Sequence, residues 1–301
     1  MVYIPRIILE PFAILLHGIF STIAKKYAKH GQRKMTIPQK MTIITIAKAF
    51  GLTYRDMELL AMDLAEVLGL ENITTFQNFN SFEKRLSTKG LQDVITMTAL
   101  IVIRMLDKRE LHIAVDSTGL QIKDSSSYYQ ERAQKKADFF KLHVVMDLET
   151  RTILLATPSD RYYHDINPFR LYFLPVLRLL ADEFGFKIKY ISADSAYAAE
   201  DTYKAVEELG ALPTIKPKRA RKGRMGKYYR MRGLPWFKYY ANRRWVLEAM
   251  FRVFKRLFKP YIRSDDQDAR AREALYKALA WNVLILLENI IKAHIAKQKN
   301  F

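Results

Sequence analysis

Three acidic residues have surroundings in which a carboxylate could do chemistry. Asp116 follows Ile-Ala-Val, and Asp194 follows Tyr-Ile-Ser-Ala, so each carboxylate closes a short apolar segment that predicts a strand. Glu248 is the lone acid of a basic stretch. Either aspartate by itself could simply cap the turn that follows it. Together, three oxygen donors without cysteine or a histidine cluster are typical of Mg²⁺ or Mn²⁺ sites, and two such ions can promote phosphodiester displacement.

The region around Glu248 predicts an amphipathic helix over residues 240–259. At 100° per residue, Arg244 and Lys255 fall within about 40° of Glu248 on a helical wheel, so the three side chains share one face. The opposite face is apolar and contains Val246, Leu247, Met250, Val253, Phe254, Leu257 and Phe258. A simpler interpretation is a solvated basic face in which Glu248 pairs with Arg244 and Arg252 at a spacing of four residues.

The segment before this helix is strongly basic. No acidic residue lies between Glu208 and Glu248, and the interval holds these cations: Lys216, Lys218, Arg219, Arg221, Lys222, Arg224, Lys227, Arg230, Arg232, Lys238, Arg243 and Arg244. Aromatic residues are interleaved with them, namely Tyr228, Tyr229, Trp236, Phe237, Tyr239 and Tyr240. Such a self-repelling segment indicates a polyanionic partner, and the rings suit contact with sugars and bases. The leading partner is nucleic acid, with Lys216, Lys218, Arg219, Arg221 and Lys222 as predicted contacts.

Composition limits the class of protein. The 301 residues are 50% hydrophobic, which is ample for a packed core, and the net charge of +19 favours nucleic acid, although an anionic membrane surface remains open. The absence of cysteine excludes disulfides, thiolate zinc sites and a cysteine nucleophile, and it fits a cytoplasmic location. The apolar runs 7–24 and 275–295 are interrupted by charged residues, so neither is interpreted as a membrane span.

Residues 1–105 predict a mainly helical region. Apolar residues at helical spacing end at Gly51, and Thr53 with Asp56 forms a capping-box pattern that opens a second helix through Leu68. This pair of helices is compatible with a helix-turn-helix that recognises DNA ends, and equally with an ordinary helical hairpin. Residues 34–40 and 72–81 are interpreted as connectors.

From residue 106 the pattern changes to that of an α/β domain ending near residue 260. Strands are expected at 111–116, 139–146, 152–156, 187–191 and 212–215, and helices at 165–184 and 198–209. This order predicts a mixed five-stranded sheet flanked by helices. If the first and fourth strands are neighbours, Asp116 and Asp194 emerge at the same sheet edge. Residues 261–301 predict a polar break and a long C-terminal helix packed on this domain.

These residues resemble the DDE transposases of bacterial and archaeal insertion sequences, over residues 51–258. The resemblance rests on five matches: Val115-Asp116-Ser-Thr118-Gly119, Lys141-Leu-His143 followed by Asp147, His164-Asp165, Ala193-Asp194-Ser-Ala-Tyr197, and Arg244-x3-Glu248-x6-Lys255. The family has a tyrosine three residues before the arginine, where this chain has Ala241.

The resemblance implies an RNase H-like fold and a DNA transposase. Asp116 and Asp194 would hold Mg²⁺ or Mn²⁺, Glu248 would complete the site, and Arg244 and Lys255 would contact phosphates of the transposon end. Hydrolysis would free a 3′-hydroxyl, which the same site would transfer to target DNA. The helical first third would recognise terminal inverted repeats, and two ends would be paired by a homodimer located on the nucleoid.

Three other functions are weighed against this one. A serine hydrolase using Ser117 or Ser195 with His164 is disfavoured, because neither serine lies in a Gly-x-Ser-x-Gly elbow. A non-enzymatic DNA-binding protein would use the basic segment without metal-dependent cleavage. A generic RNase H-like nuclease would cleave without depending on repeat ends and would form no joined products.

Overall fold

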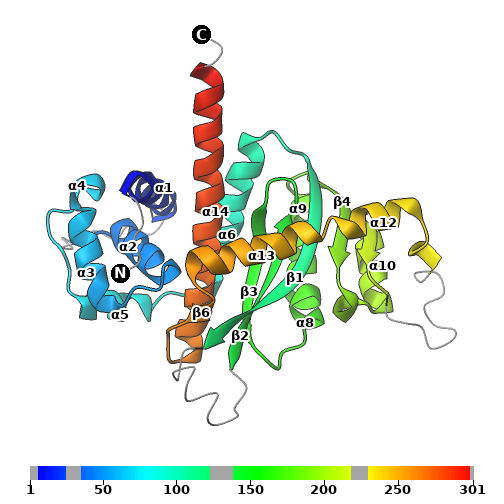
Figure 1. The fold of residues 1–301 in the computed structure, drawn as a ribbon, viewed down its shortest axis with the longest axis horizontal. Coiled ribbons are helices and arrows are strands. Elements are labelled where there is room, and N and C mark those ends of the chain that lie inside the picture. Colours follow the sequence, from blue (N-terminus) through cyan, green and yellow to red (C-terminus); the bar gives the residue numbers. More distant parts are fainter. Residues whose placement is uncertain (1–5, 25–34, 123–137, 218–229, 299–301) are drawn as a thin grey trace.

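A mixed sheet lies at the centre of the molecule, with helices on both faces (Figure 1). The computed structural model describes residues 6–24, 35–122, 138–217 and 230–298. The strands are β1 (Glu110–Ile122), β2 (Phe139–Asp147), β3 (Thr152–Asp160), β4 (Lys187–Ala193), β5 (Leu212–Ile215) and β6 (Tyr261–Ile262). The predicted α/β class is confirmed.

The strand order is β3-β2-β1-β4-β5, with β6 paired to the distal part of β1. β1, β2 and β3 form an antiparallel meander, whereas β4 and β6 pair with β1 in parallel and β5 pairs with β4 in parallel. The first and fourth strands are therefore neighbours, as the site prediction required. The sixth strand was missed because its two residues lie in a stretch interpreted as a polar break.

Each face of the sheet has its own apolar core, because successive side chains of a strand point to opposite sides. Even-numbered β1 residues such as Ala114 and Leu120 pack with the C-terminal helices, whereas Ile113 and Val115 pack with the helices between β3 and β5. The second set is α8 (Ile166–Pro168), a π-helical turn (Phe169–Phe173), α9 (Leu174–Asp182) and α10 (Glu200–Glu208). The two faces thus bring different elements toward one sheet edge.

The N-terminal region is helical, as predicted. It consists of α1 (Arg6–Ala24), α2 (Ile37–Ala49), α3 (Tyr54–Asp63), α4 (Ala65–Leu68), α5 (Phe76–Glu83) and α6 (Thr88–Met105). The capping box of Thr53 and Asp56 opens α3, and Gly51 adopts a φ of +70° between α2 and α3. Both predicted connectors are wrong in part, since α2 begins inside 34–40, where Thr36 and Gln39 form a second capping box, and α5 begins inside 72–81.

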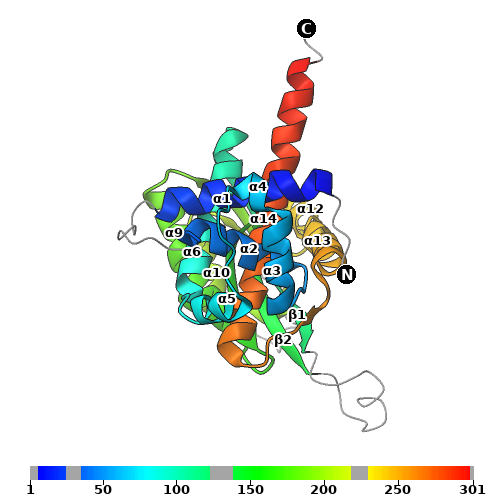
Figure 2. The same cartoon turned by 90° about the vertical axis from the view of Figure 1, so that its left-hand side faces the viewer.

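Among the described residues, three helices follow Leu234. These are α12 (Pro235–Asn242), α13 (Trp245–Phe258) and α14 (Gln267–Gln298). The expected single helix over 240–259 is interrupted at Arg243 and Arg244, so that α12 and α13 are separate. α13 crosses one face of the sheet, and α14 runs beside the sheet before its end projects from the molecule (Figures 1 and 2).

Buried ion pairs join the N-terminal helices to α14. Glu83 has no exposed side-chain surface and lies 3.3 Å from the Lys48 amine and 3.7 Å from the Arg272 guanidinium. The Tyr54 hydroxyl also donates to Glu83. The apolar core on one face of the sheet extends from α1 and α2 to α14. The division at residues 105 and 260 stays a prediction.

Two helices of the described residues, α1 and α14, are long and apolar enough to cross a membrane by length and composition. In α14, 67% of the apolar window is buried inside the fold, compared with 28% in α1. The bent pair α5 and α6, which turns by 88°, would count only if taken as one span. The interpretation of 7–24 and 275–295 as packing helices stays a prediction.

Candidate active site

Asp116 and Asp194 lie on neighbouring strands at the same level of the sheet. Val115 of β1 pairs with Ala193, the last residue of β4; Asp116 is the next residue of β1, and Asp194 is the residue directly after β4. The expectation that Asp116 closes its strand is wrong, because β1 continues to Ile122. The continuation has partners that sequence patterns did not reveal, namely β2 on one side and the short β6 on the other. Asp116 is therefore placed where β4 ends, not where β1 ends.

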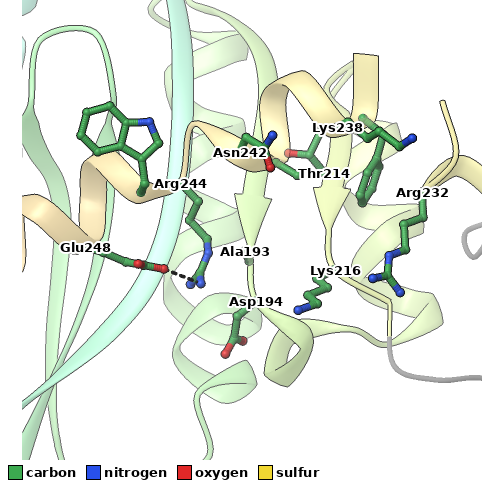
Figure 3. A pocket seen from close by; sticks show the side chains of 12 residues that line it. Ala193, Asp194, Thr214, Lys216, Arg232, Lys238, Asn242, Arg244 and Glu248 are labelled. Carbon is green, nitrogen blue, oxygen red and sulfur yellow. Dashed lines mark hydrogen bonds and ion pairs between the residues drawn. The ribbon is translucent and has the colours of Figure 1, made fainter. Parts of the chain in front are cut away.

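Glu248 reaches the same place from α13, and Arg244 connects it to Asp116. Leu247 and Met250 anchor α13 by burial in the core. The Arg244 Nη1 lies 2.7 Å from Asp116 Oδ2, and its Nη2 lies 2.7 Å from Glu248 Oε1. Figure 3 shows Arg244 pointing from the start of α13 toward the region between Glu248 and Asp194. The pairing of Arg244 with Glu248 at four residues is thus present, but the same arginine also binds an acid far away in the chain.

The two aspartates also make local hydrogen bonds. Asp116 Oδ1 accepts from the Ser117 N–H at 2.8 Å, and Asp194 Oδ1 accepts from the Ala196 N–H at 2.7 Å, which caps the 3₁₀ turn Ser195–Tyr197. The capping interpretation therefore holds for Asp194. It does not compete with a functional one, because a carboxylate has further acceptor positions free for other partners.

Electrostatics at Asp116 favour an additional cation. Burial raises the pKa of Asp116 to about 6, and the negative charges of Asp194 and Asp165 act in the same direction. The Ser117 N–H and the Arg244 guanidinium oppose this shift. Even beside Arg244, the Asp116 carboxylate is less stable than in water, chiefly because it is buried and further because of the two neighbouring acids, so an added cation would stabilise its charged form.

The donor set fits a divalent cation only in part. Asp116 and Asp194 supply the oxygen ligands that Mg²⁺ and Mn²⁺ prefer. Across the described residues, however, no group of three or more His, Cys, Asp or Glu side chains could hold one ion. Arg244 accounts for this, because its guanidinium lies against both Asp116 and Glu248. The two aspartates supply suitable oxygen donors, while Glu248 is paired with Arg244.

A cavity of about 460 Å³ opens beside the acids. Its charged lining comprises two acids, Asp194 and Glu248, and four cations: Lys216, Arg232, Lys238 and Arg244. All four cations come from the basic segment, and in Figure 3 Arg244 points between Glu248 and Asp194, whereas Arg232 and Lys238 lie farther along the wall. A positively charged cavity with acids at its rim is suited to hold a phosphodiester next to a metal site.

The predicted DNA contacts divide into three groups. Lys216 and Arg244 line the cavity. Lys255 is half-buried on α13 and is not part of the cavity wall, and burial lowers its pKa. Four predicted contacts lie outside the described residues: Lys218, Arg219, Arg221 and Lys222.

The tyrosine that the resembled family has three residues before the arginine has no counterpart in the cavity wall. Ala241 lines the cavity at the position where the resembled family has tyrosine. Tyr240, one residue earlier, stacks on Tyr190 of β4 with ring centroids 4.3 Å apart. Its ring therefore secures α12 to the sheet.

Two groups near the acids were not among the predicted site residues. Trp245 lines the cavity with 64% of its surface exposed, although its place on the helical wheel gave no reason to select it. Asp165 lies on the opposite side of the sheet, where its Oδ1 accepts from Lys141 Nζ at 3.0 Å and from Ser117 Oγ at 3.3 Å. Lys141 and Asp165 each belong to a motif that was noted in the sequence, but only the fold shows that the two side chains are in contact.

Comparison with known proteins decides the family. A family model described as "Transposase DDE domain" matches residues 107–283, which is more than half of the chain. The protein is a DNA transposase of the DDE family. The match contains Asp116, Asp194 and Glu248 and the first half of α14. No functionally curated protein matches the transposase.

Two other transposases of known structure are similar to this chain at low identity. The transposase is similar to the piggyBac transposase in a cryo-EM synaptic complex with hairpin DNA, with a TM-score of 0.43, 8% identity, and coverage of 95% of this chain and 73% of that chain. It is also similar to the Mos1 transposase in a paired-end complex with the left transposon end, with a TM-score of 0.25, 12% identity, and coverage of 87% and 85%. The Mos1 strand transfer complex gives a TM-score of 0.27, 12% identity, and coverage of 88% and 81%.

Proposed function

We propose that this transposase belongs to an insertion sequence and performs cleavage and joining of DNA at the edge of the sheet where β4 ends. The observation that carries the proposal is the meeting of Asp116, Arg244 and Glu248 beside Asp194, at the rim of a cavity with four cations. Asp116 and Asp194 would hold Mg²⁺ or Mn²⁺, with Glu248 completing the site. Such ions polarise the scissile phosphate and activate the attacking oxygen.

The cavity residues would bind and orient the transposon end. Lys216, Arg232 and Lys238 lie where they can neutralise phosphates on one strand, and Trp245 offers an exposed ring at the same wall. Arg244 has a second role here, because it holds Asp116 and Glu248 together before DNA arrives. When phosphate competes for its guanidinium, Glu248 becomes available to the aspartate pair.

The chemistry consists of two displacements at phosphorus. In the first, a water oxygen bonds to the phosphorus at the transposon end, and the bond to the 3′-oxygen breaks, which leaves a 3′-hydroxyl. In the second, this 3′-oxygen bonds to a target phosphorus, the hydroxyl proton is released, and the target's own 3′-oxygen departs and is protonated. Joining two ends requires two active sites, so the working form would be a homodimer in the cytoplasm, on the nucleoid.

The experiment compares wild type with Asp116→Asn on DNA carrying the inverted repeats of its own element. We expect wild type to nick and join this DNA in Mg²⁺ or Mn²⁺. In the variant, the rates of nicking and of joining should each fall by at least about a thousandfold, because the amide cannot supply an anionic oxygen. DNA binding should be retained. An Asp116→Asn variant that cleaves at the wild-type rate would refute the role of the acids.

The alternative function, a generic RNase H-like nuclease, is separated by the same assay. Such a nuclease would cut DNA with scrambled ends as fast as DNA with native ends, and no joined product would appear. A third outcome, repeat-specific binding without any cleavage in metal, would leave a DNA-binding protein as the remaining function.

A further inference from the structure

A second cavity, of about 520 Å³, lies against the acids from the other side of the sheet. Its wall includes Lys141, Arg161, Tyr162, His164, Ala196 and Ala198. No residue lines both this cavity and the one containing Arg244. The volume falls within the range of about 300–1,000 Å³ that is usual for ligand sites.

Hydrogen bonds tie this second cavity to the two aspartates. Ala196 of its wall donates its N–H to Asp194 Oδ1 at 2.7 Å. Asp165, also in the wall, accepts from Ser117 Oγ at 3.3 Å, and Ser117 is the neighbour of Asp116 in β1. The second cavity therefore lies one hydrogen-bonded residue away from each aspartate, whereas the first cavity is lined by Asp194 itself.

One exposed part of the wall is an aromatic ring held in place by an arginine. Tyr162 is 74% exposed, and the Arg161 guanidinium lies 4.5 Å from its ring centroid and donates to its hydroxyl. Arg161 is itself 3.2 Å from the Asp138 carboxylate. A ring fixed in this way costs little entropy when a flat ligand stacks on it, and an exposed aromatic ring beside cations is the usual platform for a nucleobase.

The floor of the cavity is preorganised. Lys141 is only 17% exposed and donates at 3.0 Å both to the Tyr163 carbonyl and to Asp165 Oδ1. Because Asp165 neutralises this lysine and Asp138 faces Arg161, the wall does not present a large excess of positive charge. This differs from the first cavity, where four cations face two acids. The second cavity is therefore better suited to a base and its sugar than to a run of phosphates.

We propose that the second cavity binds a nucleotide of the DNA strand that is not the held transposon end, with its base stacked on Tyr162. The inference rests on the proposed function, because joining requires two strands to meet at one pair of acids and the first cavity accounts for one of them. Two sources share this chemistry, namely the target strand and the donor DNA that flanks the transposon end.

The test uses the full-length protein and the variants Tyr162→Ala and Tyr162→Phe. Tyr172→Ala is the matched control, because Tyr172 is also exposed, at 52%, but lines a different groove. One arm joins a pre-cut end to a plasmid target, and the other cleaves an uncut end that carries a long flank. In parallel, 5-iododeoxyuridine is placed in the target or flanking strand, and photo-crosslinks are mapped to residues.

We expect Tyr162→Ala to lose about tenfold in joining if the cavity takes the target strand, or in cleavage of the flanked end if it takes the flank, since one base-stacking interaction has about this value. Tyr162→Phe and Tyr172→Ala should retain wild-type rates, and crosslinks should map to residues 161–164. The inference would be overturned if Tyr162→Ala joined and cleaved at the wild-type rates and the crosslinks mapped outside residues 161–164.

Failure of the proposed function gives a different result. Wild-type protein would then neither cut nor join in either arm, whereas crosslinking to residues 161–164 would still report whether the second cavity holds a DNA strand. A crosslink map that excludes these residues would overturn the inference in that case as well.

Discussion

Two regions of this transposase set carboxylates against arginine or lysine, and they differ in how the charges are balanced. The Glu83 cluster, formed by Lys48, Tyr54, Glu83 and Arg272, lies inside the molecule between α2, α3, α5 and α14. The acid site, formed by Asp116, Asp194, Arg244 and Glu248, lies at an edge of the sheet.

Inside the molecule, one carboxylate faces two cations and a hydroxyl, and its side chain is fully buried. At the sheet edge, one arginine serves two carboxylates, and a third acid lies beside them. The Glu248 side chain there is 47% exposed. A buried, cation-rich cluster is suited to lock elements together, whereas a partly exposed, acid-rich one is suited to attract a cation from solution.

The largest expected effect tests the locking role. Glu83→Gln should destabilise the fold by about 3–5 kcal/mol, because Lys48 and Arg272 would remain buried without a counter-charge. Urea unfolding of the purified protein measures this change. The control is Lys89→Ala, which removes an exposed helical pair with Asp93 and should cost less than about 0.5 kcal/mol. If Glu83→Gln is no more destabilising than this control, the cluster does not lock the helices.

A second prediction concerns the pH dependence that Asp116 imposes. Its pKa is about 6 in the fold against 3.8 ordinarily, so between these values the native protein holds a proton that the unfolded chain has released. Stability should therefore fall as pH rises through this window, by at most about 3 kcal/mol, and remain reduced above it.

Asp116→Asn removes this titration. We compare the free energies of unfolding of the variant and the wild type in metal-free buffer by urea unfolding at pH 4 and at pH 7. The difference between them should be more in favour of the variant at pH 7 than at pH 4. Both proteins share every other ionisable group. A difference in stability that is the same at the two pH values would therefore show that the pKa of Asp116 is not raised in the fold.

The smallest expected effect tests whether the Arg244 guanidinium competes with a divalent cation for Asp116 and Glu248. Arg244→Gln removes the guanidinium from Asp116 and Glu248, so Mn²⁺ should bind about tenfold more tightly, equivalent to roughly 1.4 kcal/mol. Calorimetric titration with Mn²⁺ in the absence of DNA measures this directly. Arg243→Gln is the matched control, since Arg243 pairs with Glu149 away from the acids. Unchanged or weaker Mn²⁺ binding in Arg244→Gln would contradict the competition.

Much of the architecture follows from local patterns. The strands containing Leu142 or Ile191 alternate or run apolar as their burial requires, and Thr53 with Asp56 opens a helix as its spacing indicates. β6 and the break before Trp245 did not follow, because each depends on a partner far away in the chain. β6 exists through its pairing with Gln121 and Ile122, and the break lies where Arg244 turns toward Asp116.

The sequence by itself determined the inventory of the site: two aspartates after apolar segments, one glutamate in a basic helix, and a supply of cations before it. Only the tertiary structure decided how the charges are shared. The resemblance implied that Arg244 contacts phosphate, and its spacing placed it beside Glu248, yet its nearest partners include an acid 128 residues earlier. Distance in the chain carries no information about such a contact, because parallel pairing of β1 with β4 and the packing of α13 across the sheet fix which side chains meet.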